Sequence, residues 1–282
     1  MKIIRSPKLM QKICREIKQK GKIIGFVPTM GYLHQGHLNL MRIAKKKSDV
    51  LVVSIFVNPS QFGPKEDFQR YPRDLERDKR LVEKIGCDFL FCPKIKDMYP
   101  FGYKTYVEVC DLTKVLEGAS RPSHFKGVTT VVAKLFNIVQ PDIAVFGQKD
   151  FQQAVVLKKM VDDLNYGIKI IAAPTVREKN GLALSSRNLY LSSEQREQVK
   201  VLYQALLLAK EMIKKGERNP SKIISKMREL INKQPLADID YISITDAKIL
   251  EPLKKLKGEV LFSLAIRFGK TRLIDNIKVK VS

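Results

Sequence analysis

Hydrophobic residues in the first two thirds of the chain alternate between short continuous runs and segments with helical spacing. The runs are KIIGFV, VLVVSIFV, DFLFC, DIAVF and IKIIAA, at residues 22–27, 50–57, 88–92, 142–146 and 168–173. Amphipathic helical patterns lie between or beside them, near residues 37–47, 72–85, 127–139 and 149–163. Continuously apolar strands separated by helices are typical of a parallel sheet covered on both faces. The pattern therefore predicts an α/β fold with a doubly wound, Rossmann-like parallel sheet.

A further helix is predicted before the first of these strands. Ser6 suits the N-cap position and Pro7 the first helical position, where its missing N–H is not needed. Leu9, Ile13 and Ile17 recur at helical spacing, so we expect them to form the apolar stripe of this helix.

The hydrophobic pattern changes after about residue 176. Two helical segments, near 192–215 and 220–232, are followed by the alternating runs DIDYISITDA, GEVLFSLAIRFG and TRLIDNIKVKV. Alternating strands in succession predict a small antiparallel sheet. We expect two domains, with the parallel sheet in residues 1–176 and a smaller α+β domain in residues 177–282.

The formal net charge of +23 at pH 7 permits a nucleic acid as partner. The basic residues are spread along the chain in proportion to length, without a basic arm or an arginine-rich helix interleaved with aromatic residues. This distribution favours a solvated basic surface, so we expect no nucleic-acid partner.

No run of residues approaches the roughly 18 apolar residues of a membrane span. The first residues, MKIIRSPKLMQKI, also lack the features of a signal peptide, so we expect a cytoplasmic protein without membrane contacts. The four cysteines, Cys14, Cys87, Cys92 and Cys110, form no CxxC pair. We expect them to be buried free thiols rather than a disulfide or zinc site.

The turn after the first long strand contains two of the three histidines. In PTMGYLHQGHL, residues 28–38, His34 and His37 lie where the next helix begins, and Gly31 and Gly36 free the backbone. Unpaired N–H groups at a helix start favour an anion, and imidazoles can donate to phosphoryl oxygens. We favour a triphosphate site, the alternative being that His37 continues an apolar stripe as a core histidine. A zinc site would need a further ligand at suitable spacing.

Two further polar loops follow strands at the same predicted edge of the sheet. VNPSQFGPKEDF contributes the amides of Asn58 and Gln61, which suit the hydroxyl and carboxylate groups of a small polar substrate. FGQKDFQQ contributes Lys149, which can meet phosphate charge, and places Asp150 and Gln153 on one helix face. Taken alone, the first loop is better explained as a surface turn of Asn, Pro and Gly, and the second is equally compatible with a solvated helix start.

The segment LALSSRN, residues 182–188, adds Ser185, Ser186 and Arg187 beyond the last parallel strand. Two hydroxyls and a guanidinium can close over phosphates as a mobile clamp, although the tripeptide alone is weak support. Four polar loops without an evident nucleophile, P-loop or GxGxxG favour nucleotidyl transfer.

The segments PTMGYLHQGHL, VNPSQFG, RPSHFKGVTTVVAKLFNIVQPDIAVFGQKDFQQ and LSSRN resemble, in order and spacing, those of the pantothenate synthetases. These are the pantoate–β-alanine ligases of the HxGH nucleotidyltransferase superfamily, and the resemblance covers essentially the whole chain. It implies attack of the pantoate carboxylate on the α-phosphorus of ATP, giving pantoyl adenylate and pyrophosphate. The amine of β-alanine then displaces AMP. The resemblance also implies Mg²⁺ with the nucleotide, a role in coenzyme A biosynthesis and a cytoplasmic homodimer.

Carried over to this sequence, the resemblance implies a set of site residues. His37 would be the proton donor, with His34 on the phosphates, and Lys149 and Arg187 would complete the catalytic set. The residues implied for ATP binding are Met30, Gly31, Tyr32, Leu33, His34, Gln35, Gly36, His37, Gly147, Gln148, Lys149, Asp150, Val176, Leu184, Ser185, Ser186 and Arg187. Gln61, Gln153 and Asn58 would bind substrate, with pantoate assigned to Gln61 and Gln153 and β-alanine a second candidate for Gln61.

The sequence departs from the family pattern at four of these positions. Tyr32 stands where a small residue is common, Gln35 and Gln148 where glutamate is frequent, and Leu184 where methionine is common. None of them removes a group that the chemistry needs. Another HxGH adenylyltransferase, which would transfer AMP without an amine step, stays open as an alternative. We expect the second domain, hinged after Val176, to act as a lid that keeps water from the adenylate.

Overall fold

The structure is a computed structural model that describes every residue except residue 65. The chain divides into two compact units. The first unit comprises Met1–Gln148 and Gln153–Pro174, and the second comprises Lys149–Gln152 and Thr175–Ser282. The short segment around Lys149 therefore groups with the C-terminal part of the chain.

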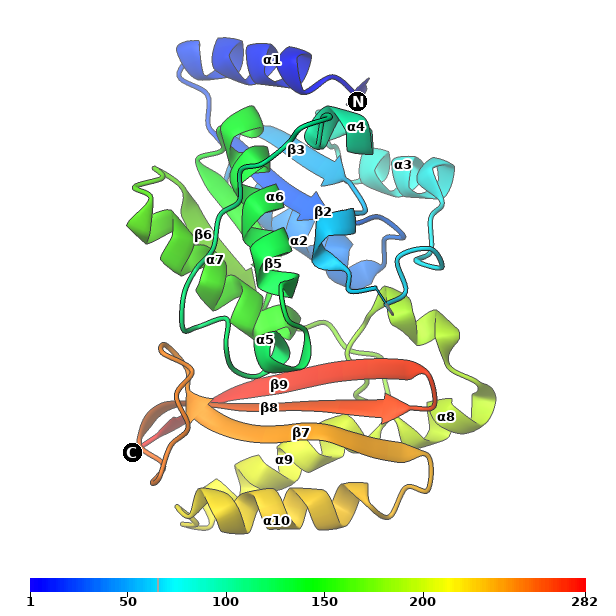
Figure 1. The fold of residues 1–282 in the computed structure, drawn as a ribbon, viewed down its shortest axis with the longest axis vertical. Coiled ribbons are helices and arrows are strands. Elements are labelled where there is room, and N and C mark those ends of the chain that lie inside the picture. Colours follow the sequence, from blue (N-terminus) through cyan, green and yellow to red (C-terminus); the bar gives the residue numbers. More distant parts are fainter. Residues whose placement is uncertain (65) are drawn as a thin grey trace. The chain divides into compact units, whose positions relative to one another are not determined.

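Among the residues described, the first unit contains a six-stranded sheet whose paired strands all run parallel (Figure 1). Across the sheet, the strands are β1 (Lys2–Ile4), β4 (Phe89–Phe91), β3 (Val50–Ile55), β2 (Ile24–Thr29), β5 (Ile143–Gly147) and β6 (Lys169–Ala173). The strand order reverses between β2 and β5. Ligands of such sheets bind beside the carboxyl ends of the strands at this reversal, so a ligand is expected at the loops after β2 and β5.

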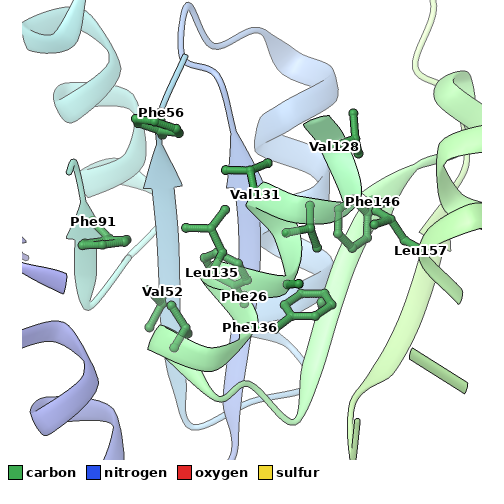
Figure 2. Close-up of a cluster of buried hydrophobic side chains, with 14 of the residues drawn as sticks. Phe26, Val52, Phe56, Phe91, Val128, Val131, Leu135, Phe136, Phe146 and Leu157 are labelled. Atoms are coloured by element: carbon green, nitrogen blue, oxygen red, sulfur yellow. The ribbon is translucent and has the colours of Figure 1, made fainter. Parts of the chain in front are cut away.

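Helices cover both faces of this sheet, which confirms the doubly wound prediction. One face packs against α1 (Pro7–Gln19), α6 (His124–Val139) and α7 (Phe151–Asp163), and the other against α2 (Gln35–Lys45) and α3 (Leu75–Lys84). Successive strand residues point to opposite faces, so Phe26 and Val52 join the α6 side while Val27 and Val53 join the α2 side. Figure 2 shows Phe136 of α6 next to Phe26, with the ring centroids 6.5 Å apart.

The connections of the first unit contain short helical turns. They are η1 (Pro59–Gln61), α4 (Ile95–Met98), α5 (Glu117–Ser120) and η2 (Gln148–Asp150), which leads into α7 across the boundary of the two units.

The N-terminal region agrees with the prediction only in part. Helix α1 has the predicted cap, since the Ser6 hydroxyl accepts from the Leu9 N–H at 3.3 Å. Of the predicted stripe, Ile13 and Ile17 are partly buried against the core, but Leu9 is 47% exposed, and the fully buried residues of the helix are Met10 and Cys14. The edge strand β1 was not predicted, because three residues are too few to show a period.

The cysteines also differ in part from expectation. Cys14, Cys87 and Cys92 are buried free thiols, and burial raises the pKa of Cys14 and Cys87 to about 12. Cys110 is a free thiol but is exposed, because it lies in a loop and not in a strand of the core.

The second unit contains helices followed by an antiparallel sheet, as predicted. After η3 (Ser186–Tyr190), the helices are α8 (Ser193–Gln198), α9 (Val201–Lys214) and α10 (Pro220–Ile231). The strands β7 (Ala237–Asp246), β8 (Gly258–Phe268) and β9 (Thr271–Val281) pair in that order. The single helix expected near 192–215 is thus two helices. Among the residues described, no helix combines the length and the apolar character needed to cross a membrane.

Candidate active site

The turn after β2 is held at the end of the strand by Thr29. Its hydroxyl donates to the Ser54 carbonyl of the neighbouring strand at 2.8 Å and accepts from the Gly31 N–H at 3.2 Å. Gly31 has a φ of 84°, which a residue with a side chain rarely adopts. The chain can therefore leave the sheet sharply and enter α2 with only five residues between strand and helix.

A buried carboxylate from α3 holds the middle of this turn. The Asp78 side chain accepts from the backbone N–H groups of Tyr32 at 2.6 Å and Leu33 at 2.8 Å. Arg77 donates to the Leu33 carbonyl at 2.8 Å, and its guanidinium lies 4.8 Å from the centre of the Tyr32 ring. Tyr32 has a φ of 47°, so the hydrogen bonds maintain a strained backbone. This support was not foreseen, since Asp78 follows the loop by more than 40 residues.

The ionisation of Asp78 reflects opposed effects. Burial raises the pKa of its carboxyl, while the N–H groups of Leu33 and Tyr32 and the charge of Arg77 lower it, and the net direction is upward. The carboxylate is thus a costly group to bury, retained where it orders two successive backbone N–H groups.

The predicted histidine pair forms the beginning of α2. His34 is the N-cap, and its Nδ1 accepts from the Gly36 N–H at 3.2 Å. The Nδ1 of His37 accepts from the His34 N–H at 3.3 Å, and the two rings lie 4.0 Å apart between centroids. Because both Nδ1 atoms accept, a neutral ring carries its hydrogen on Nε2. His37 is half-buried, unlike the core residues Leu40 and Met41 of the same helix, so it is not a core histidine.

Gln61 is the last residue of the turn η1, which follows β3, and Asn58 directly precedes this turn. The Asn58 amide is buried and donates to Gln61 Oε1 at 3.0 Å and to the Gly127 carbonyl at 3.1 Å. Its Oδ1 accepts from the Tyr99 hydroxyl at 2.8 Å. The Gln61 amide in turn contacts the sulfur of Met30, with 3.3 Å between Nε2 and Sδ. The loops after β2 and β3 therefore meet at Gln61, and Asn58 orients it.

The remaining predicted residues of the first unit are close to β5. Gly147 is the last residue of that strand, Gln148 begins η2, and Gln153 is a half-buried residue of α7. Asp150, which belongs to the second unit, is the last residue of η2 and directly precedes α7, the helix that contains Gln153.

Lys149 belongs to the second unit, where its backbone is fixed by β9. The Asn276 amide donates to the Lys149 carbonyl at 2.7 Å. The Lys149 ammonium is 3.5 Å from the Asp150 carboxylate, and the side chain is 19% exposed. Beside Asn276, the buried Asp275 accepts two hydrogen bonds from Arg177, at 2.6 and 2.9 Å. Burial raises the pKa of Asp275, and the Arg177 hydrogen bonds and charge oppose that rise.

The other predicted residues of the second unit follow one another around a short hairpin. The Leu184 N–H donates to the Val176 carbonyl at 3.0 Å, which places these two residues side by side. The Ser185 hydroxyl then accepts from the Arg187 N–H at 3.3 Å and caps η3, while Ser186 is buried. The turn gives Arg187 a defined backbone position directly after the hairpin.

Sequence reasoning also missed a half-buried cluster formed by Glu66, Arg121 and His124 next to Gln61. The third histidine of the chain was the available signal. Among the residues described, no group of three His, Cys, Asp or Glu side chains could hold a metal ion.

Comparison with known proteins agrees with these features. The family model described as pantoate-beta-alanine ligase matches residues 2–278. A pantothenate synthetase from Caldicellulosiruptor saccharolyticus is 56% identical over 272 residues, covering 96% of this chain and 97% of that protein. Another from Moorella thermoacetica is 55% identical over 282 residues, covering 100% of both.

The chain belongs to the pantoate–β-alanine ligase family. Solved structures of the family have the same fold. The crystal structure of pantothenate synthetase from Thermus thermophilus has a TM-score of 0.95 and 44% sequence identity, covering 99% of this chain and 100% of that one. The pantoate-beta-alanine ligase from Francisella tularensis, complexed with beta-gamma ATP and beta-alanine, has a TM-score of 0.79 and 38% identity. That match covers 98% of this chain and 97% of the other.

Proposed function

We propose that the chain condenses pantoate with β-alanine to pantothenate, with cleavage of ATP, through a pantoyl adenylate. The observation that carries this proposal is the histidine pair at the start of α2, beside the reversal of strand order. Family membership supports the substrates, as does the Francisella relative complexed with beta-gamma ATP and beta-alanine.

The reaction consists of two displacements that balance without a covalent enzyme intermediate. A carboxylate oxygen of pantoate bonds to the α-phosphorus of ATP while the bond to pyrophosphate breaks. The amine nitrogen of β-alanine then bonds to the acyl carbon, the C–O bond of the mixed acyl–phosphate anhydride breaks, and AMP leaves as the amine loses a proton. The protein's contribution is therefore positioning and charge stabilisation, which we assign to hydrogen-bond donors.

His34 and His37 are assigned to the phosphates. With Nδ1 of each ring accepting a backbone N–H, Nε2 of each neutral ring is a donor. The start of α2 adds the favourable end of the helix dipole. Donors fixed in this way stabilise charge that develops on phosphoryl oxygens without reorganising, and we assign His37 as a hydrogen-bond donor in this role.

Gln61 is assigned to pantoate, together with Gln153 of α7. The Gln61 amide is oriented by Asn58 and Met30, so Asn58 acts on the substrate through Gln61. An uncharged amide can both donate to a carboxylate and accept from a hydroxyl, which are the two groups that pantoate presents.

In the second unit, Lys149 and Arg187 are assigned to the triphosphate, with the hydroxyls of Ser185 and Ser186. Val176, next to Leu184, is assigned to the adenine. Mg²⁺ fits this proposal as an ion that enters with the nucleotide, because such sites use substrate phosphates and water more than protein cages. Bound there, the ion would neutralise charge on the departing pyrophosphate.

The first test is pyrophosphate release from ATP with pantoate alone, followed by AMP and pantothenate after β-alanine is added. Both signals are expected in that order. ATP turnover that requires some other acceptor and yields no amide would instead identify a different HxGH adenylyltransferase.

A second test uses His37→Ala. Loss of one preorganised donor should reduce turnover on the order of a hundredfold. Arg42→Ala is the matched control, because Arg42 is an exposed residue of the same helix. Equal turnover in the two variants would remove His37 from the reaction.

We also propose that the enzyme works as a homodimer in the cytoplasm, in coenzyme A biosynthesis, with family membership as the support. Sedimentation equilibrium should give a mass near twice 32.2 kDa. A mass of 32.2 kDa at micromolar protein would contradict the dimer.

A further inference from the structure

The backbone of Gln61 is contacted by a half-buried charged cluster that the reaction scheme above does not use. The cluster consists of Glu66, Arg121 and His124, the last being the first residue of α6. Nδ1 of His124 lies 2.8 Å from the Gln61 carbonyl oxygen, and Arg121 Nη2 donates to the same oxygen at 3.3 Å. The guanidinium also donates to both carboxylate oxygens of Glu66, at 2.8 and 2.6 Å.

The neighbours of His124 determine its tautomer. A carbonyl oxygen can only accept, so Nδ1 must carry the hydrogen that points at Gln61. Nε2 lies 3.1 Å from Nη1 of Arg121, and a guanidinium can only donate, so Nε2 must present its lone pair. Both contacts are satisfied only by a neutral imidazole with its hydrogen on Nδ1. This is the opposite tautomer to the one that the contacts of His34 and His37 select.

The charges around the ring maintain the neutral form. Burial lowers the pKa of His124 to about 4, and the charge of Arg121 acts in the same direction, against the Gln61 carbonyl, Glu66 and Glu117. For Glu66, burial raises the pKa, but the hydrogen bonds and charge of Arg121 outweigh it and the net shift is downward. The cluster is therefore a fixed ion pair beside a neutral ring at neutral pH.

Gln61 is thus held at both ends. Its side-chain amide contacts Asn58 and Met30, and its backbone carbonyl contacts His124 and Arg121. The carbonyl and the side chain share one Cα, so a rotation of the peptide would swing the amide away from the direction that Asn58 sets. The backbone contact restricts that rotation.

We propose that His124, kept as the Nδ1–H tautomer by the Arg121–Glu66 ion pair, is a positioning residue that aims the Gln61 amide at pantoate. This inference rests on the proposed function of Gln61 as a pantoate contact. The decisive element is the hydrogen bond from Nδ1 to the Gln61 carbonyl, with Arg121 fixing the ring in the orientation that provides it.

Two amide substitutions distinguish the role of the Nδ1 donor from the role of the Nε2 acceptor. In His124→Asn, the amide nitrogen can occupy the place of Nδ1 and donate to the Gln61 carbonyl. In His124→Gln, the amide oxygen can reach the place of Nε2 and accept from Arg121, while the donor at Nδ1 is lost. His124→Ala loses both interactions. Lys126→Ala is the control, because Lys126 is on the same helix and its ammonium pairs with Glu108 at 3.4 Å, away from this cluster.

The measurement is the steady-state rate of pantothenate formation with pantoate and ATP varied separately. The Gln and Ala variants should lose roughly tenfold in kcat/KM for pantoate, mainly through KM, as for the loss of one well-made hydrogen bond. His124→Asn should stay within about threefold of wild type. The KM for ATP should be the same in all four proteins and in the control.

Several outcomes would overturn the inference. These are equal losses in the Asn and Gln variants, or an equal rise in KM for pantoate and ATP, because a merely structural histidine would produce either. If His124→Ala does not fold, the comparison of Asn with Gln still decides. Failure of the proposed function has a different signature, since Gln61→Ala would then leave the pantoate parameters unchanged, or wild type would form no pantothenate.

Discussion

Removing the buried carboxylate of Asp78 should loosen the turn that leads to the histidine pair. Asp78 lies on α3 and accepts from the N–H groups of Tyr32 and Leu33, with distances of 2.6 and 2.8 Å. In Asp78→Ala these two donors lose their acceptor, and nothing replaces the bridge from α3 to the turn. The strained Tyr32 backbone, with a φ of 47°, then loses the hydrogen bond that holds its N–H in this conformation.

The expected loss of stability follows from the burial of the N–H groups of Tyr32 and Leu33. Each buried N–H left without a partner costs about 1–3 kcal/mol. Part of this loss is offset, because the Asp78 carboxylate is itself costly to bury, as the upward shift of its pKa indicates. Arg77 is 36% exposed and can be hydrated once the carboxylate is gone. We therefore expect Asp78→Ala to lower the free energy of unfolding by about 2–4 kcal/mol, and Asp78→Asn, which keeps one acceptor oxygen, by about half of that.

Two assays on the same proteins test this account. Urea denaturation at pH 7 gives the free energy of unfolding, and pantoate-dependent pyrophosphate release gives kcat/KM for ATP. Asp74→Ala is the matched control, because Asp74 caps the same helix by accepting from the Arg77 N–H at 2.9 Å but does not touch the turn. Loss of an N-cap costs about 1 kcal/mol, and it should leave kcat/KM for ATP unchanged.

The reasoning fails if Asp78→Ala loses no more stability than Asp74→Ala. It also fails if the two variants have the same kcat/KM for ATP, because the turn would then keep its shape without the carboxylate.

Three further expectations concern Gly127, His124 and Asp275. In Gly127→Ala the added methyl would meet the Ser60 backbone, so the free energy of unfolding in urea should fall by about 1–3 kcal/mol. The kcat/KM for pantoate should fall as well. Unchanged stability and unchanged kcat/KM would contradict this close approach. The pKa of His124 is about 4 in the folded protein and 6.5 in the unfolded chain, so the unfolded chain binds the proton more readily. The free energy of unfolding should therefore be highest above pH 6.5 and should fall by up to about 3 kcal/mol as the pH is lowered towards 4. The His124→Asn variant should show a flatter stability curve over that pH interval. Asp275→Ala leaves Arg177 uncompensated and should cost about 3 kcal/mol, whereas a change below 1 kcal/mol would show that the ion pair contributes little.

Much of the fold was predictable because its determinants are local. Continuously apolar runs such as VLVVSIFV identify strands buried on both faces, and the alternation of runs with helical patterns indicates a parallel sheet. The cap at Ser6 is equally local, since the hydroxyl reaches an N–H only three residues away. Two histidines beside two glycines at a predicted helix start indicated a phosphate site before any contact was known.

Other features depend on contacts between distant residues, which leave no periodic trace in a sequence. Strand β1 has only three residues and exists because β4 offers a parallel partner. Lys149 follows a strand of the first unit, but its carbonyl is held by Asn276, 127 positions later.

The supports of the proposed site belong to the same class. Asp78 is 45 positions from Leu33, and His124 is 63 positions from Gln61. Read in sequence, a lone aspartate or histidine is indistinguishable from a solvated surface residue. The sequence by itself determined which chemical groups this protein has and the elements that carry them. Tertiary structure alone decided which polar groups are buried against the backbone of those elements, because hydrogen-bond geometry and desolvation arise only when distant segments pack together.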